Sequence, residues 1–261
     1  MSNTQGDFIW YELMTRDIDA AQTFYSGLLG WQITDSGMPG MDYRIGSMGD
    51  APVVGLLSLD DEMLENGAYP QWSGYISVDK LDDSVKQACD MGARLLMDPQ
   101  DVEGVGRFAF VTDPQGVPFY LMTATGDTSH SFAKYEAADG HCAWNELLST
   151  DPADARRFYG ELFGWVKVDE MDMGDRGLYE MLRNDDYLVG AVMPKPMEAP
   201  VPLWIFYFRV ADIDKASEYI TSHGGRLLQG PIEIPGGEFI IQGLDPQGAL
   251  FALIGKRLNP A

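Results

Sequence analysis

The chain has 261 residues, a formal net charge of −22 and a pI near 4.2. Such an acidic surface repels phosphate backbones and anionic lipid headgroups, which argues against nucleic acid and membrane surfaces as partners. No apolar run approaches the roughly 20 residues of a membrane span, and the first residues, MSNTQGDF, lack the regions of a signal peptide. We therefore expect a cytoplasmic protein.

Residues 8–15 read FIWYELMT, which predicts a strand with Trp10, Glu12 and Met14 on one face. Asp17 is suited to cap a helix N-terminus, and one apolar stripe follows it at three- and four-residue spacing. Gly30 is expected to end this helix. Three further strands are predicted at 31–34, 43–47 and 53–59.

A second set of elements follows a polar segment, 60–70, that predicts a connecting loop. It has a strand at 72–78, a helix that begins at Asp82 or Asp83 and ends before Gly92, and a strand at 93–97. Strands 107–112 and 117–123 form a hairpin joined by Asp113-Pro114-Gln115-Gly116, residues that suit a type I turn. The first half therefore predicts two βαβββ modules in succession.

Residues 126–139 are mostly small and polar, which predicts a linker between domain 1, residues 1–125, and domain 2, residues 140–261. The stretch from Trp10 to Asp35 returns in the second half from Trp144 to Asp169, and such self-similarity indicates a duplicated unit. Strands are expected at 142–148, 178–183, 188–193, 204–210, 227–229, 239–243 and 250–255, and helices at 153–163 and 213–222. The predicted fold class is α+β, with four βαβββ modules paired in two tandem domains.

The cysteines and histidines form no recognisable metal or disulfide motif. Cys89 and Cys142 lie in different halves, and we expect both to be buried free thiols. Of the three histidines, His130 and His223 are expected to face solvent, and His141 is the one close to a predicted strand that carries candidate site residues.

The most specific patterns are FYxxLxGW, at Phe24–Trp31 and again at Phe158–Trp165, and the two DPQG turns. With four βαβββ modules, they make the chain similar to the vicinal oxygen chelate superfamily, which includes glyoxalase I, extradiol dioxygenases and bleomycin-resistance proteins. The first half of each domain is similar to its tandem, lactoylglutathione-lyase-related subgroup. The resemblance implies that each pair of modules curls its strands into a half-open cup with helices outside, and that the cup is the active site.

In metal-dependent members of that superfamily, His, Gln or Glu ligands project into the cup from four strand positions. The resemblance places these positions on residues that mostly cannot bind metal through their side chains. They are Trp10, Gly55, Ser73 and Tyr120 in the first domain and Trp144, Gly190, Ile205 and Ala252 in the second. No metal site and no cofactor are predicted, although the resemblance alone would allow a divalent metal.

Glu12 and Glu146 are the candidate catalytic residues. Strand alternation puts each on the face of a tryptophan two residues earlier, and a carboxylate among aromatic rings has the raised pKa that suits a general base. The alternative is a structural role, in which each carboxylate bonds a backbone amide or pairs with an arginine such as Arg209.

The candidate ligand-binding residues are mainly aromatic, because such rings combine apolar area with a polar edge or tip. Packing in the core is the alternative for each tyrosine. Arg209 has no counterpart in the first domain, where Ser77 stands, and would either clamp an anionic ligand or pair with an acidic side chain. The set comprises Trp10, Tyr43, Tyr75, Tyr120, Trp144, Tyr179, Tyr207 and Arg209.

Three functions are compatible with these residues. The favoured one is a metal-free protein that binds a small, partly aromatic molecule in one or both cups. The second is an enzyme, either a lyase or dioxygenase with unfamiliar metal ligands or a metal-free acid–base catalyst that uses Glu12 or Glu146. The third is a chain in which one domain has become a structural partner that closes the other's cup or forms a homo-oligomer.

Overall fold

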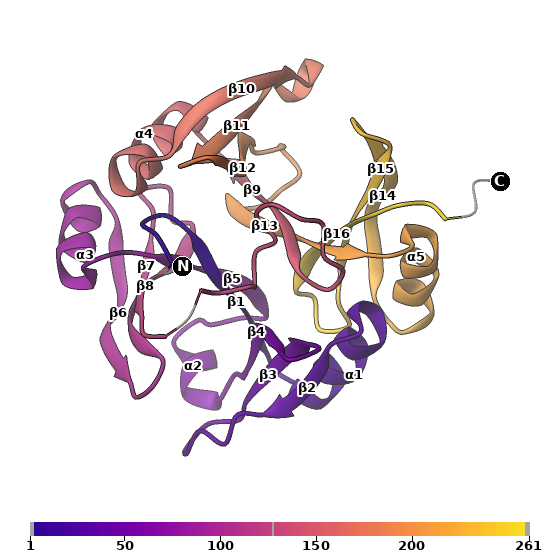
Figure 1. Ribbon diagram of the computed structural model, residues 1–261, viewed down its shortest axis with the longest axis horizontal. Coiled ribbons are helices and arrows are strands. Elements are labelled where there is room, and N and C mark those ends of the chain that lie inside the picture. The colour runs from indigo at the N-terminus through magenta and orange to yellow at the C-terminus, as the bar shows by residue number, and fades with distance from the viewer. Residues whose placement is uncertain (1–2, 127, 259–261) are drawn as a thin grey trace. The chain divides into compact units, whose positions relative to one another are not determined.

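The computed structural model describes residues 3–126 and 128–258. Within them the chain forms the four predicted βαβββ modules, which confirms the α+β fold class (Figure 1). The strands form two eight-stranded mixed sheets, one from each half of the sequence, in the orders β2-β3-β4-β1-β5-β8-β7-β6 and β10-β11-β12-β9-β13-β16-β15-β14. None of the helices in these ranges combines the length and apolar character that a membrane span needs.

The first half of the chain contains modules one and two. Asp17 caps α1 by accepting a hydrogen bond from the backbone N–H of Ala20, and Gly30 ends the helix with a φ of 75°, as the sequence predicts. The elements are β1 (Phe8–Thr15), α1 (Ile18–Leu29), β2 (Gln32–Asp35), β3 (Tyr43–Met48), β4 (Ala51–Ser58), α2 (Asp61–Glu65), β5 (Gln71–Ser77), α3 (Leu81–Asp90), β6 (Arg94–Val102), β7 (Gly106–Thr112) and β8 (Pro118–Ala124).

The second half contains modules three and four, with the same order of main elements. Asp151 and Gly164 cap α4 as Asp17 and Gly30 cap α1. The elements are β9 (Cys142–Ser149), α4 (Pro152–Phe163), β10 (Val166–Asp172), the 3₁₀ turn η1 (Gly174–Arg176), β11 (Leu178–Asn184), β12 (Tyr187–Pro194), β13 (Leu203–Val210), α5 (Ile213–Ser222), β14 (Arg226–Ile234), β15 (Glu238–Leu244) and β16 (Leu250–Gly255).

Several local predictions were wrong. The expected loop at 60–70 contains α2, because Asp60 caps it by accepting from the N–H of Met63. Helix α3 begins after Lys80, so Asp82 and Asp83 lie in its first turn rather than at its cap. Cys89 is exposed, because Ala88 takes the core-facing position of that turn.

The other cysteine is buried, as predicted. Burial raises the pKa of the Cys142 thiol to about 12, so the group stays protonated and inert at neutral pH. His130 and His223 are exposed, which confirms the expectation for both.

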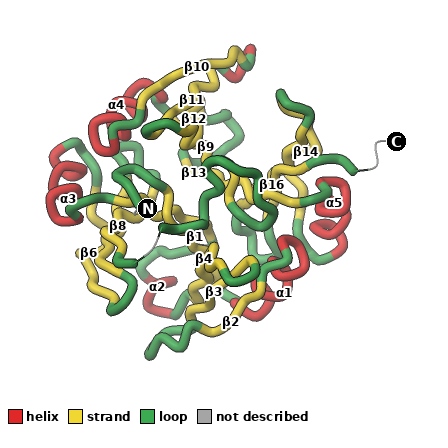
Figure 2. Tube along the Cα trace, in the orientation of Figure 1, coloured by secondary structure: helices red, strands yellow, loops and turns green. Residues whose placement is uncertain are grey.

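The compact parts of the molecule do not follow the halves of the sequence. Compact unit 1 comprises residues 1–10, 73–129 and 145–204, and compact unit 2 comprises residues 11–72, 130–144 and 205–261. Unit 1 therefore contains most of modules two and three, and unit 2 contains most of modules one and four. In each unit two helices lie side by side, α3 with α4 and α1 with α5 (Figures 1 and 2).

In compact unit 2, the repeated sequence motifs contact each other. The Tyr25 hydroxyl of the first FYxxLxGW motif donates to the Asp245 carboxylate of the second DPQG turn at 3.1 Å, and the Trp72 indole donates to that hydroxyl. The Trp31 indole donates to the carbonyl of Gly140 at 2.7 Å. The motif residues are thus core, and they also bond segments from the other half of the chain.

Compact unit 1 repeats this arrangement with the other copies of the motifs. The Tyr159 hydroxyl donates to Asp113 at 3.2 Å, and the Trp204 indole donates to Tyr159. The Trp165 indole donates to the carbonyl of Gly6 at 3.0 Å. Each unit is therefore stabilised by motifs that lie far apart in sequence.

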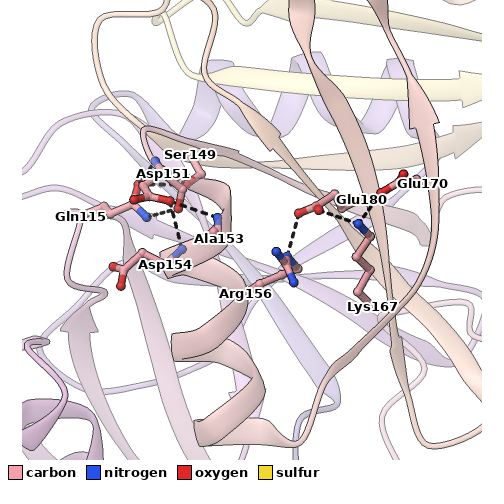
Figure 3. A network of polar contacts seen from close by, with 9 residues as sticks. All are labelled: Gln115, Ser149, Asp151, Ala153, Asp154, Arg156, Lys167, Glu170 and Glu180. Carbon is pink, nitrogen blue, oxygen red and sulfur yellow. Dashed lines mark hydrogen bonds and ion pairs between the residues drawn. The ribbon is translucent and has the colours of Figure 1, made fainter.

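Each DPQG glutamine forms a further set of bonds, which we call a glutamine bridge. The Oε1 atom of Gln247 accepts from the Thr15 hydroxyl and the backbone N–H groups of Arg16 and Asp17, and its Nε2 donates to the Asp17 carbonyl. Gln115 forms the matching bonds with residues 149–151 at the cap of α4. Figure 3 shows Gln115 beside Ser149 and Asp151. The bridges fix the strand–helix junctions in which β1 and β9 end.

Candidate ligand-binding faces

An aromatic cluster fills one face of the second module, within compact unit 1. The rings of Tyr75 on β5 and Tyr120 on β8 are stacked, with centroids 4.0 Å apart and planes 7° from parallel. Phe110 stacks on the other side of Tyr120 at 4.3 Å, and Phe108 meets both tyrosines edge-on. Tyr75 and Tyr120 are 6% and 5% exposed, and their stacking with Phe110 fills this face with aromatic rings.

The sequence named three members of this cluster. Tyr75 and Tyr120 are in it, and Trp10 packs against it together with Phe108 and Phe110. The two phenylalanines were missed, although their alternation on β7 opposite Tyr120 was readable once the hairpin was assigned. We call this set the Tyr75 face. It brings Trp10, Tyr75 and Tyr120 together, but as packed rings.

The matching face of the fourth module, in compact unit 2, carries smaller and more polar side chains. Ala252 stands opposite Tyr207 in the parallel pairing of β13 and β16, as Tyr120 stands opposite Tyr75. Gln242 stands opposite Ala252, where Phe110 stands opposite Tyr120. The amide of Gln242 donates to the Tyr207 hydroxyl at 2.7 Å, so the Tyr207 ring extends across Ala252. Tyr207 is 3% exposed and Ala252 is fully buried.

Arg209 and Glu238 complete this second face, which we call the Tyr207 face. Both guanidinium Nη atoms of Arg209 contact the Glu238 carboxylate, and the Nη2–Oε2 distance is 3.1 Å. Arg209 thus pairs with an acidic side chain, one of its two expected roles, and its partner is not a candidate catalytic glutamate. The face comprises Tyr207, Arg209, Glu238, Ile240, Gln242, Ala252 and Ile254.

Glu146 and Tyr179 meet in the third module, within compact unit 1. The Tyr179 hydroxyl on β11 donates to the Glu146 carboxylate on β9 at 3.1 Å, and Glu146 is 6% exposed. Two candidate residues, one catalytic and one ligand-binding, therefore lie within hydrogen-bond distance. The bond is compatible with both roles considered for Glu146, a base or a structural carboxylate.

The remaining candidates belong to compact unit 2. Glu12 is buried on β1, opposite Gly55 of β4 in a parallel pairing. Tyr43 is half-buried on β3, and Trp144 is half-buried on β9, where its carbonyl accepts from the Cys142 thiol. The structure thus divides the candidate set between the two units.

The donor set does not fit a metal of the superfamily's kind. In residues 3–126 and 128–258, no three His, Cys, Asp or Glu side chains come together in a way that could hold a metal ion. Trp10 and Tyr120, at two of the positions given by the resemblance, pack in the Tyr75 face. His141 directs Nδ1 to the carbonyl of His130, 2.6 Å away. No chemical step is therefore derived through a metal.

Two open cavities lie elsewhere and are lined by paired charges. One, of about 560 Å³, includes Arg44, which pairs with Asp19 and Asp42. The other, of about 290 Å³, includes Arg156, which pairs with Glu180 as Figure 3 shows. Their cations already hold carboxylates, and the residues that line the two cavities include no aromatic side chain.

Comparison with known proteins identifies the two halves separately. Residues 140–253 match the family described as Glyoxalase/Bleomycin resistance protein/Dioxygenase superfamily, and residues 10–122 match the family described as Glyoxalase-like domain. The Mycobacterium tuberculosis protein named "Putative glyoxylase CFP32" is 32% identical over 253 residues, which cover 96% of this chain and 95% of that protein.

More distant similarities extend over nearly the whole chain. The anthracycline biosynthesis protein DauV of a Streptomyces species is 26% identical over 261 residues, which cover 95% of this chain and 92% of that protein. The Mn(II)-bound glyoxalase from Novosphingobium aromaticivorans has a TM-score of 0.65 at 17% identity, covering 98% of this chain and 83% of its own. The dioxygenase LapB from Pseudomonas sp. KL28 has a TM-score of 0.66 at 14% identity, covering 100% and 96%. These structures share the fold.

Proposed function

Because the chain belongs to the glyoxalase/bleomycin resistance protein/dioxygenase superfamily, we propose that it binds a small, partly aromatic molecule on the Tyr207 face. One observation carries the proposal. Ala252 and Gln242 stand at the positions that Tyr120 and Phe110 fill with stacked rings on the other face. Ala252 is fully buried and Tyr207, which reaches across it to Gln242, is 3% exposed. A ligand ring would therefore displace the Tyr207 ring from Ala252 and take the place that Tyr120 fills on the other face.

The surroundings of Ala252 suit such a ligand. Tyr207 offers an apolar ring, Ile240 and Ile254 offer aliphatic area, and Gln242 and Arg209 supply polar groups that could orient a ligand. The name of the DauV relative supports the same ligand class, because anthracyclines contain planar fused rings. We also propose that the domains divide at residues 1–125 and 140–261, which contain the two family matches.

A thermal-shift screen of two- and three-ring aromatic compounds tests this proposal. Binding to the native state raises the apparent melting temperature, so we expect hits with the wild type. The substitution Ala252→Phe should abolish the shift, because the new ring would occupy the place of the ligand. Leu96→Phe, which adds a ring at a 50% exposed side chain on β6 of the second module, should leave it. A shift that survives Ala252→Phe in a folded variant would refute the site.

A second candidate function is metal-free acid–base catalysis, favoured by the bond between Tyr179 and Glu146. A buried carboxylate that accepts from a phenol can take a proton from a substrate bound beside it. Glu12, at the matching position of the first module, is the analogous candidate. If an activity is found with aromatic carbonyl compounds, Glu146→Gln should lower kcat at least 100-fold, whereas an unchanged kcat would leave Glu146 structural.

A further inference from the structure

The ion pair between Arg209 and Glu238 distinguishes the fourth module from the second. The corresponding residues of the second module are Ser77 and Gly106, which cannot form it. Arg209 reaches from β13 across β16 to Glu238 on β15, and the two side chains are 13% and 22% exposed. The pair therefore lies within the Tyr207 face and remains open to solvent at one edge.

The guanidinium group of Arg209 is only partly satisfied. A guanidinium can bind acceptors end-on through its two Nη atoms or side-on through Nε and one Nη. Glu238 occupies the end-on edge. The Nε atom is buried, and in the described part of the chain no group accepts a hydrogen bond from it. A buried donor without an acceptor is costly, so a ligand that entered the face and reached this edge would gain a hydrogen bond by supplying one.

The charge of the missing acceptor can be argued from the same contacts. The hydrogen bonds from Arg209 lower the pKa of Glu238, so this carboxylate is ionised and already neutralises the guanidinium. A second carboxylate on the side-on edge would lie next to Glu238 on a chain with a net charge of −22. An uncharged oxygen avoids both repulsions and still receives a hydrogen bond from a charged donor.

We infer that the Tyr207 face selects aromatic ligands that carry an uncharged carbonyl oxygen, of the ketone or quinone class, which accepts from Nε of Arg209. This inference rests on the proposed function, because it names the polar group of the ligand whose ring covers Ala252. From the sequence, Arg209 was a candidate to bind an anionic ligand. The inferred ligand is neutral instead.

Three nearly isosteric probes test the inference on the wild-type protein by equilibrium dialysis. They are 2-acetylnaphthalene, which has a ketone, 2-ethylnaphthalene, which has no oxygen, and 2-naphthoate, which is anionic. A hydrogen bond from a charged donor strengthens binding about tenfold or more. We therefore expect the ketone to bind about tenfold more tightly than the hydrocarbon, and the carboxylate to bind more weakly than the ketone.

Two variants then separate the effect of the Nε–H donor of Arg209 from the effect of its positive charge. Arg209→Lys keeps the positive charge beside Glu238 but has no Nε–H, so the ketone should lose its advantage over the hydrocarbon. Glu238→Gln leaves Arg209 without a counter-charge, so the affinity for 2-naphthoate should rise about tenfold while that for the hydrocarbon stays unchanged. Glu233→Gln, an exposed charge on the paired strand β14, is the matched control and should change none of the three affinities.

The outcomes distinguish this inference from the proposed function. If no probe binds the wild type, both fail. If the ketone and the hydrocarbon bind equally, the face binds aromatic rings but Arg209 does not select a carbonyl, and only this inference is overturned. If 2-naphthoate binds the wild type most tightly, Arg209 is an anion clamp and the neutral ligand is wrong. The wild-type comparison decides these cases even if a variant fails to fold.

Discussion

At the scale of single residues, Tyr120 and Ala252 show how one register position can serve two purposes. Each stands opposite a tyrosine in the same parallel strand pairing. Tyr120 is buried between Tyr75 and Phe110, and it fills its face with protein. Ala252 carries no ring, and Tyr207 extends across it to Gln242. We propose that a ligand ring takes the place of the Tyr207 ring there.

Because Tyr120 is packed between two rings, its truncation should cost stability. We expect Tyr120→Ala to lower the free energy of unfolding by about 3–5 kcal/mol, the range for large aromatic side chains removed from a core. Urea denaturation measures it. Tyr135→Ala, at a side chain that is 70% exposed, is the control and should change stability by no more than about 0.5 kcal/mol. Equal effects of the two substitutions would contradict the stacked cluster.

Asp245 gives a second residue-scale prediction, on pH dependence. Burial raises its pKa above the ordinary value, although hydrogen bonds from Ala249, Gln247 and Tyr25 oppose the shift. The folded state therefore binds this proton more readily than the unfolded state, and the resulting stability is present at low pH and lost as pH rises through the folded pKa. Tyr25 stays a neutral donor, because burial and then the Asp245 charge raise its pKa well above 10.

The variant Asp245→Asn isolates this contribution. The unfolding free energy of the wild type minus that of the variant should increase as the pH falls from 7 toward the ordinary aspartate pKa of about 4. Chemical denaturation at several pH values provides the difference, and subtraction removes the titration of other groups. A difference that decreases on acidification would show that the pKa of Asp245 is lowered.

At the scale of elements, the glutamine bridges organise the junctions between β1 and α1 and between β9 and α4. Gln247 accepts from three groups of residues 15–17, and Gln115 accepts from four groups of residues 149–151. Each bridge holds a helix cap, Asp17 or Asp151, in the extended conformation that capping needs.

Removal of either bridge should loosen its junction. We expect Gln115→Ala to lower the free energy of unfolding by about 1–3 kcal/mol, because several backbone and hydroxyl donors lose a common acceptor. The amide protons of Thr150 and Asp151 should also exchange faster with solvent. Hydrogen exchange read by NMR measures both sites, and Gln100→Ala, on exposed β6, serves as the control. Unchanged exchange at both amides would mean that the bridge adds no local stability.

Many of the helix ends and turns could be predicted from sequence, and the predictions that were wrong have physical causes. Helix caps and the DPQG turns follow from local rules, so Asp17, Gly30 and both turns were predicted. Strands β6 and β14 continue past Pro99 and Pro231, because shifts of register near these prolines accommodate the missing N–H. The contact of Tyr25 with Asp245 joins residues 220 positions apart, and no local pattern encodes such a pairing.

The residue types of the candidate site could be predicted from sequence, but the contacts between their side chains could not. The sequence named Trp10, Tyr75 and Tyr120 as candidates, but it could not show that they pack in one cluster or that the two tyrosine rings stack on each other. It also could not show that Glu238 would pair with Arg209, because that contact depends on the pairing of β15 with β16. Residue type is local information, whereas the partner of a side chain is tertiary information.

At the scale of the whole molecule, both compact units draw on both halves of the chain. Unit 1 takes residues 73–129 from the first half and 145–204 from the second, and unit 2 takes 11–72 and 205–261. Cleavage in the segment 126–139 should therefore leave two fragments that stay bound to each other, since each unit keeps the contacts that build its core.

A protease site inserted between Glu136 and Ala137, two exposed residues, tests this expectation. After cleavage, the fragments should elute as one species in native size-exclusion chromatography and separate only in denaturant. An insertion of the same length without a recognition sequence is the control. Independent elution of two folded fragments would show that the halves of the sequence, rather than the compact units, are the units of stability.

Each half of the chain supplies a glutamine bridge to the other half, and this exchange bears on how the gene arose. Gln247, near the end of the chain, holds the start of the first module, and Gln115 holds the start of the third. An ancestor of half this length would have carried one such turn and one such junction. In that ancestor, the glutamine of the DPQG turn would have bonded the strand–helix junction of a second copy of the chain. Duplication and fusion would then have joined two chains that already exchanged these contacts, and afterwards each half was free to diverge, as the Tyr75 and Tyr207 faces have done.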